Sequence, residues 1–375
     1  MPTPPYLLEE TRTCPMVLGS REENRQEEVK RVIQTNTKKM NVPFSKPAFN
    51  EQEVEAASKA IRSGWVTTGP LTAKFEEEFA KFVGSKYAVF VNSGTSALRL
   101  AIEWNKTKYN LKTAYVPSLT FAATAHEAIH AGLDVLWGDV DQETMCLLPS
   151  DVGNIAIPVH LTGNRASVAY SCPVVEDSAH LVEKDQCKGS KNLVCFSFYA
   201  TKNLSTGEGG MIACNTKEAY TWLMKARHHG IDRRPGGSPI YDVEFIGWKA
   251  NQSDILAAIG LVQLKKLPSM LKKRAKIVDM YNKGLGQHCC GLHLYPVFSN
   301  DRDEFVKEMA KAGIQCSIHF RPLHKMMAYS STRDLVTTEY LGGGLVSLPL
   351  FPDMTIEQVK YVIETIKKIN LTLPL

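Results

Sequence analysis

Lys202 is the residue whose type and surroundings most favour chemistry. It follows an apolar stretch at 193–198, which predicts a buried strand, and it precedes a Gly-Glu-Gly-Gly turn at 207–210. Lysine is almost never fully buried without a partner. Burial beside an apolar strand lowers the pKa of a lysine and favours the free, nucleophilic amine. We therefore expect Lys202 to act as a Schiff-base amine, the alternative being an ordinary solvated lysine.

A carboxylate follows a second predicted strand. Asp177 comes directly after Val174-Val175-Glu176, 25 residues (202 − 177) before Lys202. Ligands of parallel α/β folds bind at the carboxyl ends of the strands, so Asp177 could hold a ring nitrogen in its protonated form. The alternatives are a helix cap for Asp177 and a satisfied, partly buried histidine for His180.

A third segment, Asn92-Ser93-Gly94-Thr95-Ser96-Ala97-Leu98, joins a predicted strand to a predicted helix. Glycine permits close backbone approach, and the amides of a helix N-terminus attract anions. By itself the segment could be a plain helix cap. With Asp177 and Lys202 it matches the three handles of pyridoxal 5′-phosphate (PLP), which are the phosphate, the ring nitrogen and the aldehyde.

Composition indicates a globular protein with room for two domains. The chain has 375 residues, of which 44% are hydrophobic and 22% charged, and a net charge of +5. That charge is too small to indicate nucleic-acid binding. No apolar run is long enough for a membrane span, and the start lacks a signal peptide, so we expect a cytoplasmic protein. The nine cysteines fit reduced thiols, and Cys289-Cys290 lacks the spacer of a metal site.

Three regions follow from the patterning: a polar extension at 1–40 with a short exposed helix near Glu27 and Arg31, a large domain at 41–265, and a small α+β domain at 266–375. The large domain alternates predicted helices and strands, which favours an α/β fold with a mostly parallel sheet. We expect helices at 51–62, 71–83, 95–104 and 122–131, and strands at 87–91, 114–116, 135–137, 155–159, 174–175 and 193–198. The small domain should contain helices at 302–312 and 355–369 and a strand at 315–320.

Over residues 41–372 the chain resembles the DegT/DnrJ/StrS sugar aminotransferases, which are PLP enzymes of fold type I. The motifs that carry the resemblance occur in order at 64–70, 92–95, 117–121, 158–160, 176–180, 197–210, 251–260, 319–324 and 347–352. Within that family the nearest resemblance, from the segments at 42–47 and 351–355, is to enzymes of the UDP-4-amino-4-deoxy-L-arabinose aminotransferase type, which aminate the sugar C4.

The resemblance implies a role for each matching residue. Lys202 would form the internal aldimine and later move a proton, Asp177 would pair with the pyridinium, and His180 would sit beside the 3-hydroxyl side of the cofactor. Phe121 would stack on the ring, or otherwise be an ordinary core phenylalanine. Gly94, Thr95 and Ser197 would bind the phosphate, and Asn251 would reach the phosphate of a neighbouring subunit, which implies a homodimer. His319 and Phe320 would lie near the substrate entrance.

Two segments depart from the family pattern. Only 15 residues (175 − 160) separate His160 from Glu176, so we expect a peripheral helix to be shortened or lost, and 285–295 is also short. The loop at 227–247 cannot be aligned to function. Its Arg233 and Arg234 could meet the diphosphate of a nucleotide sugar or lie solvated.

These observations predict an aminotransferase that moves an amino group from an amino acid, expected to be glutamate, to a nucleotide-linked keto-sugar, with amination at C4. One alternative is a PLP-dependent sugar dehydratase, although those relatives replace the lysine by histidine and this chain keeps Lys202. The other is a regulatory protein that retains the fold without catalysis.

Overall fold

A seven-stranded sheet forms the centre of the chain. The computed structural model describes residues 39–233, 240–329 and 331–369. Two ladders, β3-β2-β4 and β5-β6-β7-β1, are joined by parallel bridges from Ala156 to Val174 and from Val159 to Asp177. Only β7 runs antiparallel to its neighbours, which confirms the mostly parallel α/β sheet. The strands, in spatial order, are β3 (Asp134–Gly138), β2 (Thr113–Pro117), β4 (Ile155–Ala156), β5 (Val175–Asp177), β6 (Leu193–Ser197), β7 (Gly210–Cys214) and β1 (Tyr87–Val91).

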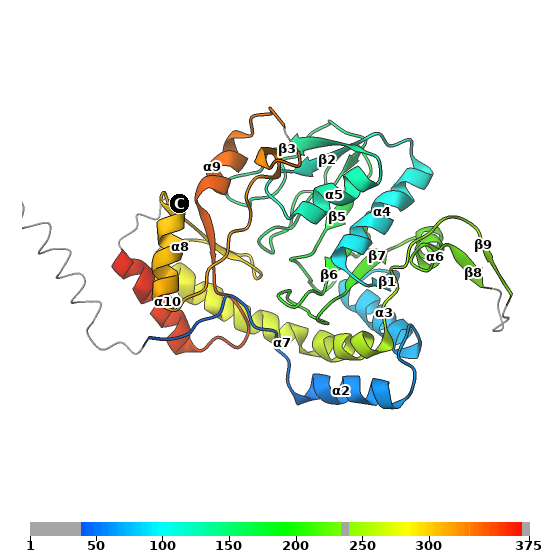
Figure 1. Ribbon diagram of the computed structural model, residues 1–375, viewed down its shortest axis with the longest axis horizontal. Helices are drawn as coiled ribbons and strands as arrows, with labels where there is room; N and C mark the ends of the chain where they lie inside the picture. The colour runs from blue at the N-terminus through cyan, green and yellow to red at the C-terminus, as the bar shows by residue number, and fades with distance from the viewer. Residues whose placement is uncertain (1–38, 234–239, 330, 370–375) are drawn as a thin grey trace, which may run out of the picture. The chain divides into compact units, whose positions relative to one another are not determined.

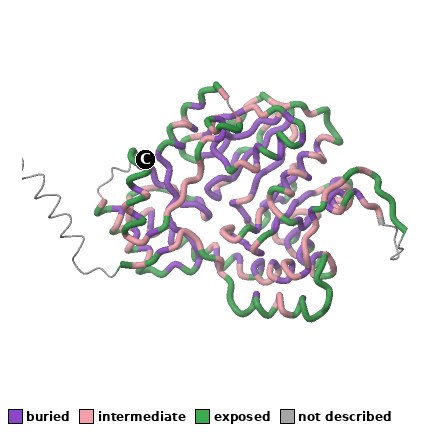
Figure 2. Tube along the Cα trace, viewed as in Figure 1, coloured by how far each residue is buried: buried purple, intermediate pink, exposed green. Residues whose placement is uncertain are grey.

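Helices bury both faces of this sheet (Figures 1 and 2). Side chains alternate along a strand, so Cys195 of β6 packs into one core while Val194 and Phe196 pack into the other. The first core is closed by α4 (Gly94–Lys108), α5 (Ala122–His130) and α6 (Lys217–Ala226). The second is closed by α3 (Pro70–Val83) and α7 (Asp254–Leu285). The continuous apolar runs of β1 and β6 follow from this burial on two sides.

Helix ends are fixed by side chains from distant parts of the sequence. The carboxylate of Asp254 accepts hydrogen bonds from the backbone of Gly69, Leu71 and Thr72, at 2.8 to 3.0 Å, and so caps α3 from the start of α7. Helix α2 (Glu51–Arg62) begins at a capping box in which Asn50 and Glu53 bond reciprocally. These contacts hold the loop before α3 beside the start of α7.

The C-terminal part has its own core. It is built on β10 (Tyr295–Phe298) paired with β11 (Leu345–Leu348), with α8 (Arg302–Lys311), α9 (Val336–Gly344) and α10 (Ile356–Ile369). Val42 packs in the same core. Helix α7 runs for 32 residues through both regions and contains Pro268. The predicted domain boundary at 265/266 therefore falls inside one continuous helix, and the two-domain division stays a prediction.

A two-stranded hairpin of β8 (Ile231–Arg233) and β9 (Tyr241–Val243) projects from the large region beyond α6 (Figure 1). Tyr241 and Val243 are exposed. Lys225 joins the base of the hairpin through Asp232 and Glu244, at 3.3 and 2.6 Å. The side chain of Arg233 and the whole of Arg234 lie outside what the structure describes, so both alternatives for this pair, a diphosphate contact and a solvated loop, stay predictions.

Most helices and strands expected in the large region are confirmed, and their observed ends differ from the predicted ends by at most four residues. The predicted strand at 315–320 is wrong. Only Ser317 forms a bridge there, with Ser347, while the Gln315 backbone bonds to Val42 instead, so no continuous ladder forms. No helix occurs between β4 and β5 at 157–174, which confirms the loss expected from the short spacing. The exposed helix expected near residues 27–31 lies outside the described residues. No described helix has the length and apolarity that a membrane span requires.

Candidate active site

A cavity of about 430 Å³ opens at the carboxyl ends of β5 and β6. Nine of the ten residues predicted for the site line it: Gly94, Thr95, Phe121, Asp177, His180, Ser197, Lys202, His319 and Phe320. They come from strand ends and turns that are far apart in the sequence. The sheet therefore brings the first seven together, whereas His319 and Phe320 come from the C-terminal part.

Lys202 sits in a tight turn after β6. The turn is closed by backbone bonds from Phe198 to Gly209, at 2.8 Å, and from Thr206 to Phe198, at 2.9 Å. Gly207, with φ of 85°, supplies the left-handed residue that this turn requires. Burial lowers the pKa of the Lys202 amine to about 8, although the nearby Asp177 carboxylate opposes that change. About a tenth of the amine is therefore uncharged and nucleophilic at pH 7, far more than for a lysine with the ordinary pKa of 10.5.

Asp177 ends β5 with its carboxylate in the cavity. Its Oδ2 accepts a hydrogen bond from Thr124 Oγ1 at 2.8 Å, and its Oδ1 accepts one from the Ala179 backbone at 3.1 Å. Burial raises the pKa of Asp177, although the Thr124 bond and the Lys202 charge act in the opposite direction. A cation in the cavity would stabilise the ionised Asp177 carboxylate and offset the cost of its burial. The protonated ring nitrogen of PLP therefore fits this position.

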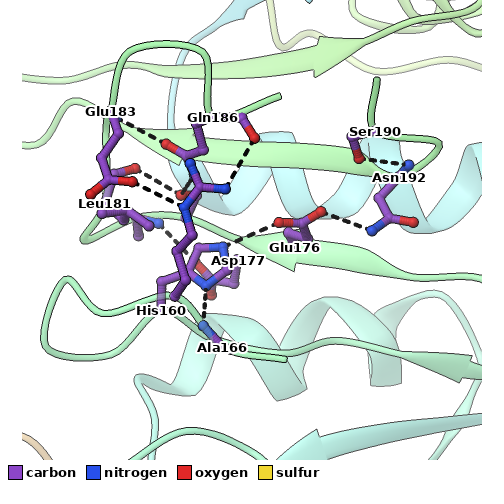
Figure 3. Close-up of polar contacts among 12 residues, drawn as sticks. His160, Ala166, Glu176, Asp177, Leu181, Glu183, Gln186, Ser190 and Asn192 are labelled. Atoms are coloured by element: carbon purple, nitrogen blue, oxygen red, sulfur yellow. Dashed lines mark hydrogen bonds and ion pairs between the residues drawn. The ribbon is translucent and has the colours of Figure 1, made fainter. Parts of the chain in front are cut away.

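Glu176 anchors the strand that presents Asp177 (Figure 3). Its side chain points to the other face of β5, where it accepts hydrogen bonds from His160 Nε2 at 3.2 Å and Asn192 Nδ2 at 2.8 Å. The Ala166 backbone donates to His160 Nδ1, so the proton of that imidazole is on Nε2. Burial raises the pKa of Glu176, but these bonds outweigh burial and leave the pKa lowered. An ionised Glu176 therefore fixes the strand end beside Asp177.

Gly94 and Ser197 line the part of the cavity at the N-terminus of α4, which is called the anion recess below. Ser93 caps the helix through the Ser96 backbone at 3.0 Å, which leaves Gly94 and Thr95 at the open end. A Cβ on Gly94 would lie only 2.8 Å from Ser197 Cβ, and one on Gly210 would lie 2.3 Å from the Ser93 carbonyl oxygen. Only glycine allows the helix end to approach β6 this closely. The phosphate of PLP fits a helix N-terminus flanked by the Thr95 and Ser197 hydroxyls.

His180 and His293 are stacked in the cavity wall, with ring centroids 4.2 Å apart. The Leu161 carbonyl can only accept, so His180 Nδ1 carries the proton and Nε2 keeps its lone pair. His293 Nδ1 lies 3.3 Å from Asn203 Oδ1 and donates to it for the same reason. Burial lowers the pKa of both histidines well below the ordinary value, so both are neutral.

The mouth of the cavity is aromatic. Phe121 is 60% exposed and lies 6.0 Å, between ring centroids, from Phe320. His319 stacks near Phe44 at 5.4 Å and contacts the Ser347 hydroxyl at 3.0 Å. Burial, and then the Lys202 charge, lower the pKa of His319 to about 4. The mouth therefore combines one residue from the large region with two from the C-terminal part.

Asn251 does not line this cavity. It lies where the chain passes β1, and its side chain donates to Thr68 Oγ1 at 2.6 Å and accepts from Lys249 Nζ at 2.6 Å. Its predicted role toward a neighbouring subunit stays a prediction.

Sequence reasoning missed several residues that line or support the site. His293 was not among the predicted site residues, yet it lines the cavity, and its backbone and that of Leu294 bond to the Thr162 carbonyl at 3.1 and 3.2 Å. The two short segments, at 161–175 and 285–295, thus contact each other and place His293 in the cavity wall. Thr124, which orients Asp177, follows Phe121 by one helical turn, and that spacing was the available signal.

Metal ligation has no support in the described ranges, because no group of three or more histidine, cysteine or acidic side chains there could hold an ion. All cysteines in those ranges are free thiols. The site therefore offers an amine, a buried carboxylate and an anion recess.

Comparison with known proteins matches this arrangement. The model of the DegT/DnrJ/EryC1/StrS aminotransferase family matches residues 47–367. The spore coat polysaccharide biosynthesis protein SpsC of Bacillus subtilis is 33% identical over 88% of this chain and 97% of its own length.

Among solved structures, Spr1654 of Streptococcus pneumoniae, to which sugar aminotransferase activity is assigned, has a PMP form that is 28% identical, with a TM-score of 0.80, covering 88% of this chain and 99% of that one. Its PLP form has a TM-score of 0.78 at 26% identity, covering 88% and 98%. PseC of Helicobacter pylori, at 22% identity and a TM-score of 0.80 over 88% of this chain and all of that one, shares the fold.

The residues present fit PLP at each of its three handles, and the family match covers most of the chain. The chain belongs to the DegT/DnrJ/EryC1/StrS family of PLP-dependent sugar aminotransferases, and it is a PLP-dependent enzyme of fold type I.

Proposed function

We propose that this enzyme transfers the amino group of an amino acid, glutamate, to a nucleotide-linked keto-sugar at C4. The observation that carries the proposal is the pairing, in one cavity, of a Lys202 amine whose pKa is lowered to about 8 with the buried Asp177 carboxylate. The likeness to SpsC and to Spr1654 supports a sugar acceptor. The choice of glutamate and C4 follows the sequence resemblance.

The roles of the cofactor residues follow from their positions. PLP supplies an electron sink for the carbon that loses or gains the amine. Asp177, oriented by Thr124 and Ala179, holds the ring nitrogen protonated. Gly94, Thr95 and Ser197 would hold the phosphate, Phe121 the ring, and His180 the side of the 3-hydroxyl. The Lys202 amine would hold the aldehyde carbon, and it would also serve as the group that accepts and donates a proton.

The scarcity of positively charged side chains in the cavity supports an uncharged sugar ring as the part of the substrate that reacts there. Among the described residues that line it, Lys202 is the one lysine or arginine. All three lining histidines, His180, His293 and His319, are neutral near pH 7 because burial lowers their pKa. A nucleotide diphosphate is strongly anionic and therefore lies at or outside the mouth beyond His319 and Phe320, where water and exposed groups solvate it.

A spectroscopic assay of transamination, which follows the absorbance of the bound cofactor, would test this proposal. Purified enzyme with PLP should absorb near the visible edge, lose that band with glutamate, and regain it with one member of a panel of nucleotide-linked keto-sugars. Lys202→Ala should abolish both changes, whereas Lys191→Ala, at an exposed lysine just before β6, should leave them intact. A Lys202→Ala enzyme with full transamination would sink the proposal.

The same assay separates the two alternatives. Loss of water from the sugar, with no amino group gained, would identify a dehydratase, and Lys202 in place of histidine argues against it. Failure of every donor to change the PLP spectrum would indicate a regulatory protein. The intact set of Lys202, Asp177 and Thr95 favours catalysis over the regulatory alternative.

A homodimer with shared sites is part of the proposal. Asn251 is turned away from its own cavity, and the nearby Trp65 and Val66 are exposed apolar side chains, at 55% and 49%. These features fit a subunit interface in which Asn251 reaches the cofactor phosphate of the other copy. Mixed dimers of Lys202→Ala and Asn251→Ala subunits should regain activity that neither parent has. Absence of recovery in verified mixed dimers would refute shared sites.

We also propose the cytoplasm as the location of the enzyme. Free thiols throughout the described residues support it, because reduced cysteines are typical of that compartment.

A further inference from the structure

A buried relay of serine, histidine and glutamate lies beside the cavity but does not line it. Ser118 Oγ is 2.6 Å from His324 Nδ1, and His324 Nε2 is 3.1 Å from Glu339 Oε1. Ser118 is fully buried and His324 is 1% exposed. A substrate cannot reach Ser118, so nucleophilic catalysis by this relay is excluded.

The hydrogen-bond roles in the relay are determined by the neighbours. Glu339 is held ionised, because its bonds from the Leu335 backbone, His324 and Lys325 lower its pKa to about 2. His324 Nε2 therefore carries the proton and donates to Glu339, which leaves a lone pair on Nδ1. The Ser118 hydroxyl donates to that lone pair and accepts from the His324 backbone at 3.0 Å. Every polar atom of His324 and Ser118 in the relay is thus satisfied.

The relay joins three elements that surround the mouth. Ser118 follows β2 and lies three residues before Phe121, and His324 lies four residues after Phe320. The Leu323 backbone also donates to the Ser118 carbonyl at 2.9 Å. Glu339 belongs to α9, whose N-terminus is bonded to Asp139 through the Thr337 and Thr338 backbones at 3.1 and 2.8 Å.

Close packing reinforces this connection. A Cβ on Gly342 of α9 would lie 2.4 Å from the Pro322 ring, so the segment that carries Phe320 is seated directly on α9. The ends of β2 and β3 therefore hold both the segment at 319–325 and the helix behind it.

We propose that His324 is a positioning residue that sets the separation of Phe121 and Phe320 and thereby the shape of the substrate mouth. The proposal rests on the function proposed above, in which Phe121 covers the cofactor and Phe320 borders the acceptor sugar. His324 touches neither of them. It acts through Ser118 on one side and through its own backbone on the other.

Two substitutions of His324 separate the Ser118 bond from the Glu339 bond. Asparagine places an acceptor where Nδ1 was and keeps the Ser118 bond, whereas glutamine reaches only the position of Nε2 and keeps the Glu339 bond. We expect His324→Gln to lower kcat/KM for the acceptor sugar on the order of tenfold, mainly through a higher KM, because displaced groups near a site cost that much or more. His324→Asn should stay within about threefold of the native value, since it retains the Ser118 hydrogen bond.

Ser118→Ala provides the partner for a double-mutant cycle. Combined with His324→Gln, it should produce little further loss, because both changes remove the same contact. Exposed His130, paired with Glu127 at 3.1 Å, gives the matched control His130→Gln, which should be neutral.

Hydrogen exchange of the PLP-loaded enzyme supplies a readout that needs no substrate. His324→Gln should speed exchange in peptides covering 318–326, whereas peptides covering β1 and β7 should keep the native rate. Equal behaviour of the Asn and Gln variants in kinetics and exchange would overturn the proposal, as would additive losses in the cycle. Absence of turnover in the native enzyme with every sugar would instead refute the proposed function, while the exchange result would still decide the role of His324.

Discussion

The two walls of the cavity are built in different ways. The sheet-side wall, defined here as Gly94, Asp177, Ser197 and Lys202, consists of strand ends and the turns directly attached to them. The opposite wall, defined as His293, His319 and Phe320, arrives on segments from the C-terminal part and is held by contacts such as His293 to Thr162 and His324 to Ser118. In the function proposed above, the first wall holds the phosphate, ring nitrogen and aldehyde of the cofactor, and the second meets the substrate. We therefore expect changes in the first to affect chemistry and changes in the second to affect KM.

Asp177→Asn should produce the largest effect. Asparagine keeps the size of the side chain but removes the charge that holds the ring nitrogen protonated, so we expect kcat to fall by about 10³-fold, within the range for loss of a positioned charge in an active site. Stopped-flow measurement of the donor half-reaction would test this. Asp279→Asn, at an exposed pair with Lys283, is the control and should be neutral. A fall of less than tenfold would mean that Asp177 does not serve the ring nitrogen.

The pH dependence of PLP capture by the apo-enzyme should reflect Lys202. Its pKa near 8 lies below the ordinary lysine value of 10.5, so the reactive free amine predominates above pH 8. The capture rate should reach half its plateau near pH 8 and fall to about 1% of the plateau two pH units lower.

The stability of the apo-enzyme should rise between pH 8 and 10.5, because only the lysine of the unfolded chain still binds its proton in that range.

Denaturant unfolding of native and Lys202→Met apo-enzyme across that range would test the second part. The native protein should gain stability relative to the variant as the pH rises from 8 to 10.5. Capture that is half-maximal near pH 10.5 would show that burial does not perturb the amine.

Gly94→Ala probes the anion recess. The added Cβ would meet Ser197 Cβ at 2.8 Å, so the end of α4 must move away from β6. We expect the Kd for PLP to rise by about tenfold, which corresponds to about 1.4 kcal/mol. Gly343→Ala is the matched control, because nothing lies within 4 Å of the added atom there. Fluorescence titration with PLP would measure both, and equal affinities would remove Gly94 from the recess.

His293→Phe should have the smallest effect and tests the second wall. Phenylalanine keeps a ring against His180 but loses the hydrogen bond to Asn203, which is worth about 0.5–1.5 kcal/mol. We expect KM for the acceptor to rise up to about tenfold with kcat within about threefold. A loss of kcat as large as that of Asp177→Asn would break the distinction between the two walls.

The same distinction explains what could be predicted from the sequence. Lys202, Asp177 and Gly94 each follow a short apolar run, and a strand end fixes a side chain within a few residues, so local patterning sufficed. His293 and His324 depend on bonds to Thr162 and Ser118, more than 130 residues away in the sequence, and no local pattern encodes those partners. The strand predicted at 315–320 failed for a related reason. Cys316 packs in the core of the C-terminal part and Phe320 lines the cavity mouth, so the segment serves two different partners and forms no ladder.

Family resemblance recovered part of what local patterning could not. It brought His319 and Phe320 into the predicted site, and both line the cavity. The resemblance could not predict how the two short segments at 161–175 and 285–295 pack in this chain. Those segments compensate for each other by packing together, as the bonds from His293 and Leu294 to Thr162 demonstrate.

Helix α7 is one continuous helix shared by the large region and the C-terminal part. Its first half packs with α3 against the sheet, and its second half packs in the core of the C-terminal part. Pro268 lies near the end of the part that packs against the sheet and has no N–H, so the main chain lacks one hydrogen bond at that point. Met270, just after it, is the last buried α7 residue of the sheet-side core, and Ile277 is the first of the C-terminal core. An opening of the mouth that leaves both cores intact would therefore bend α7 after Met270 and before Ile277, on the opposite side of the sheet from α4.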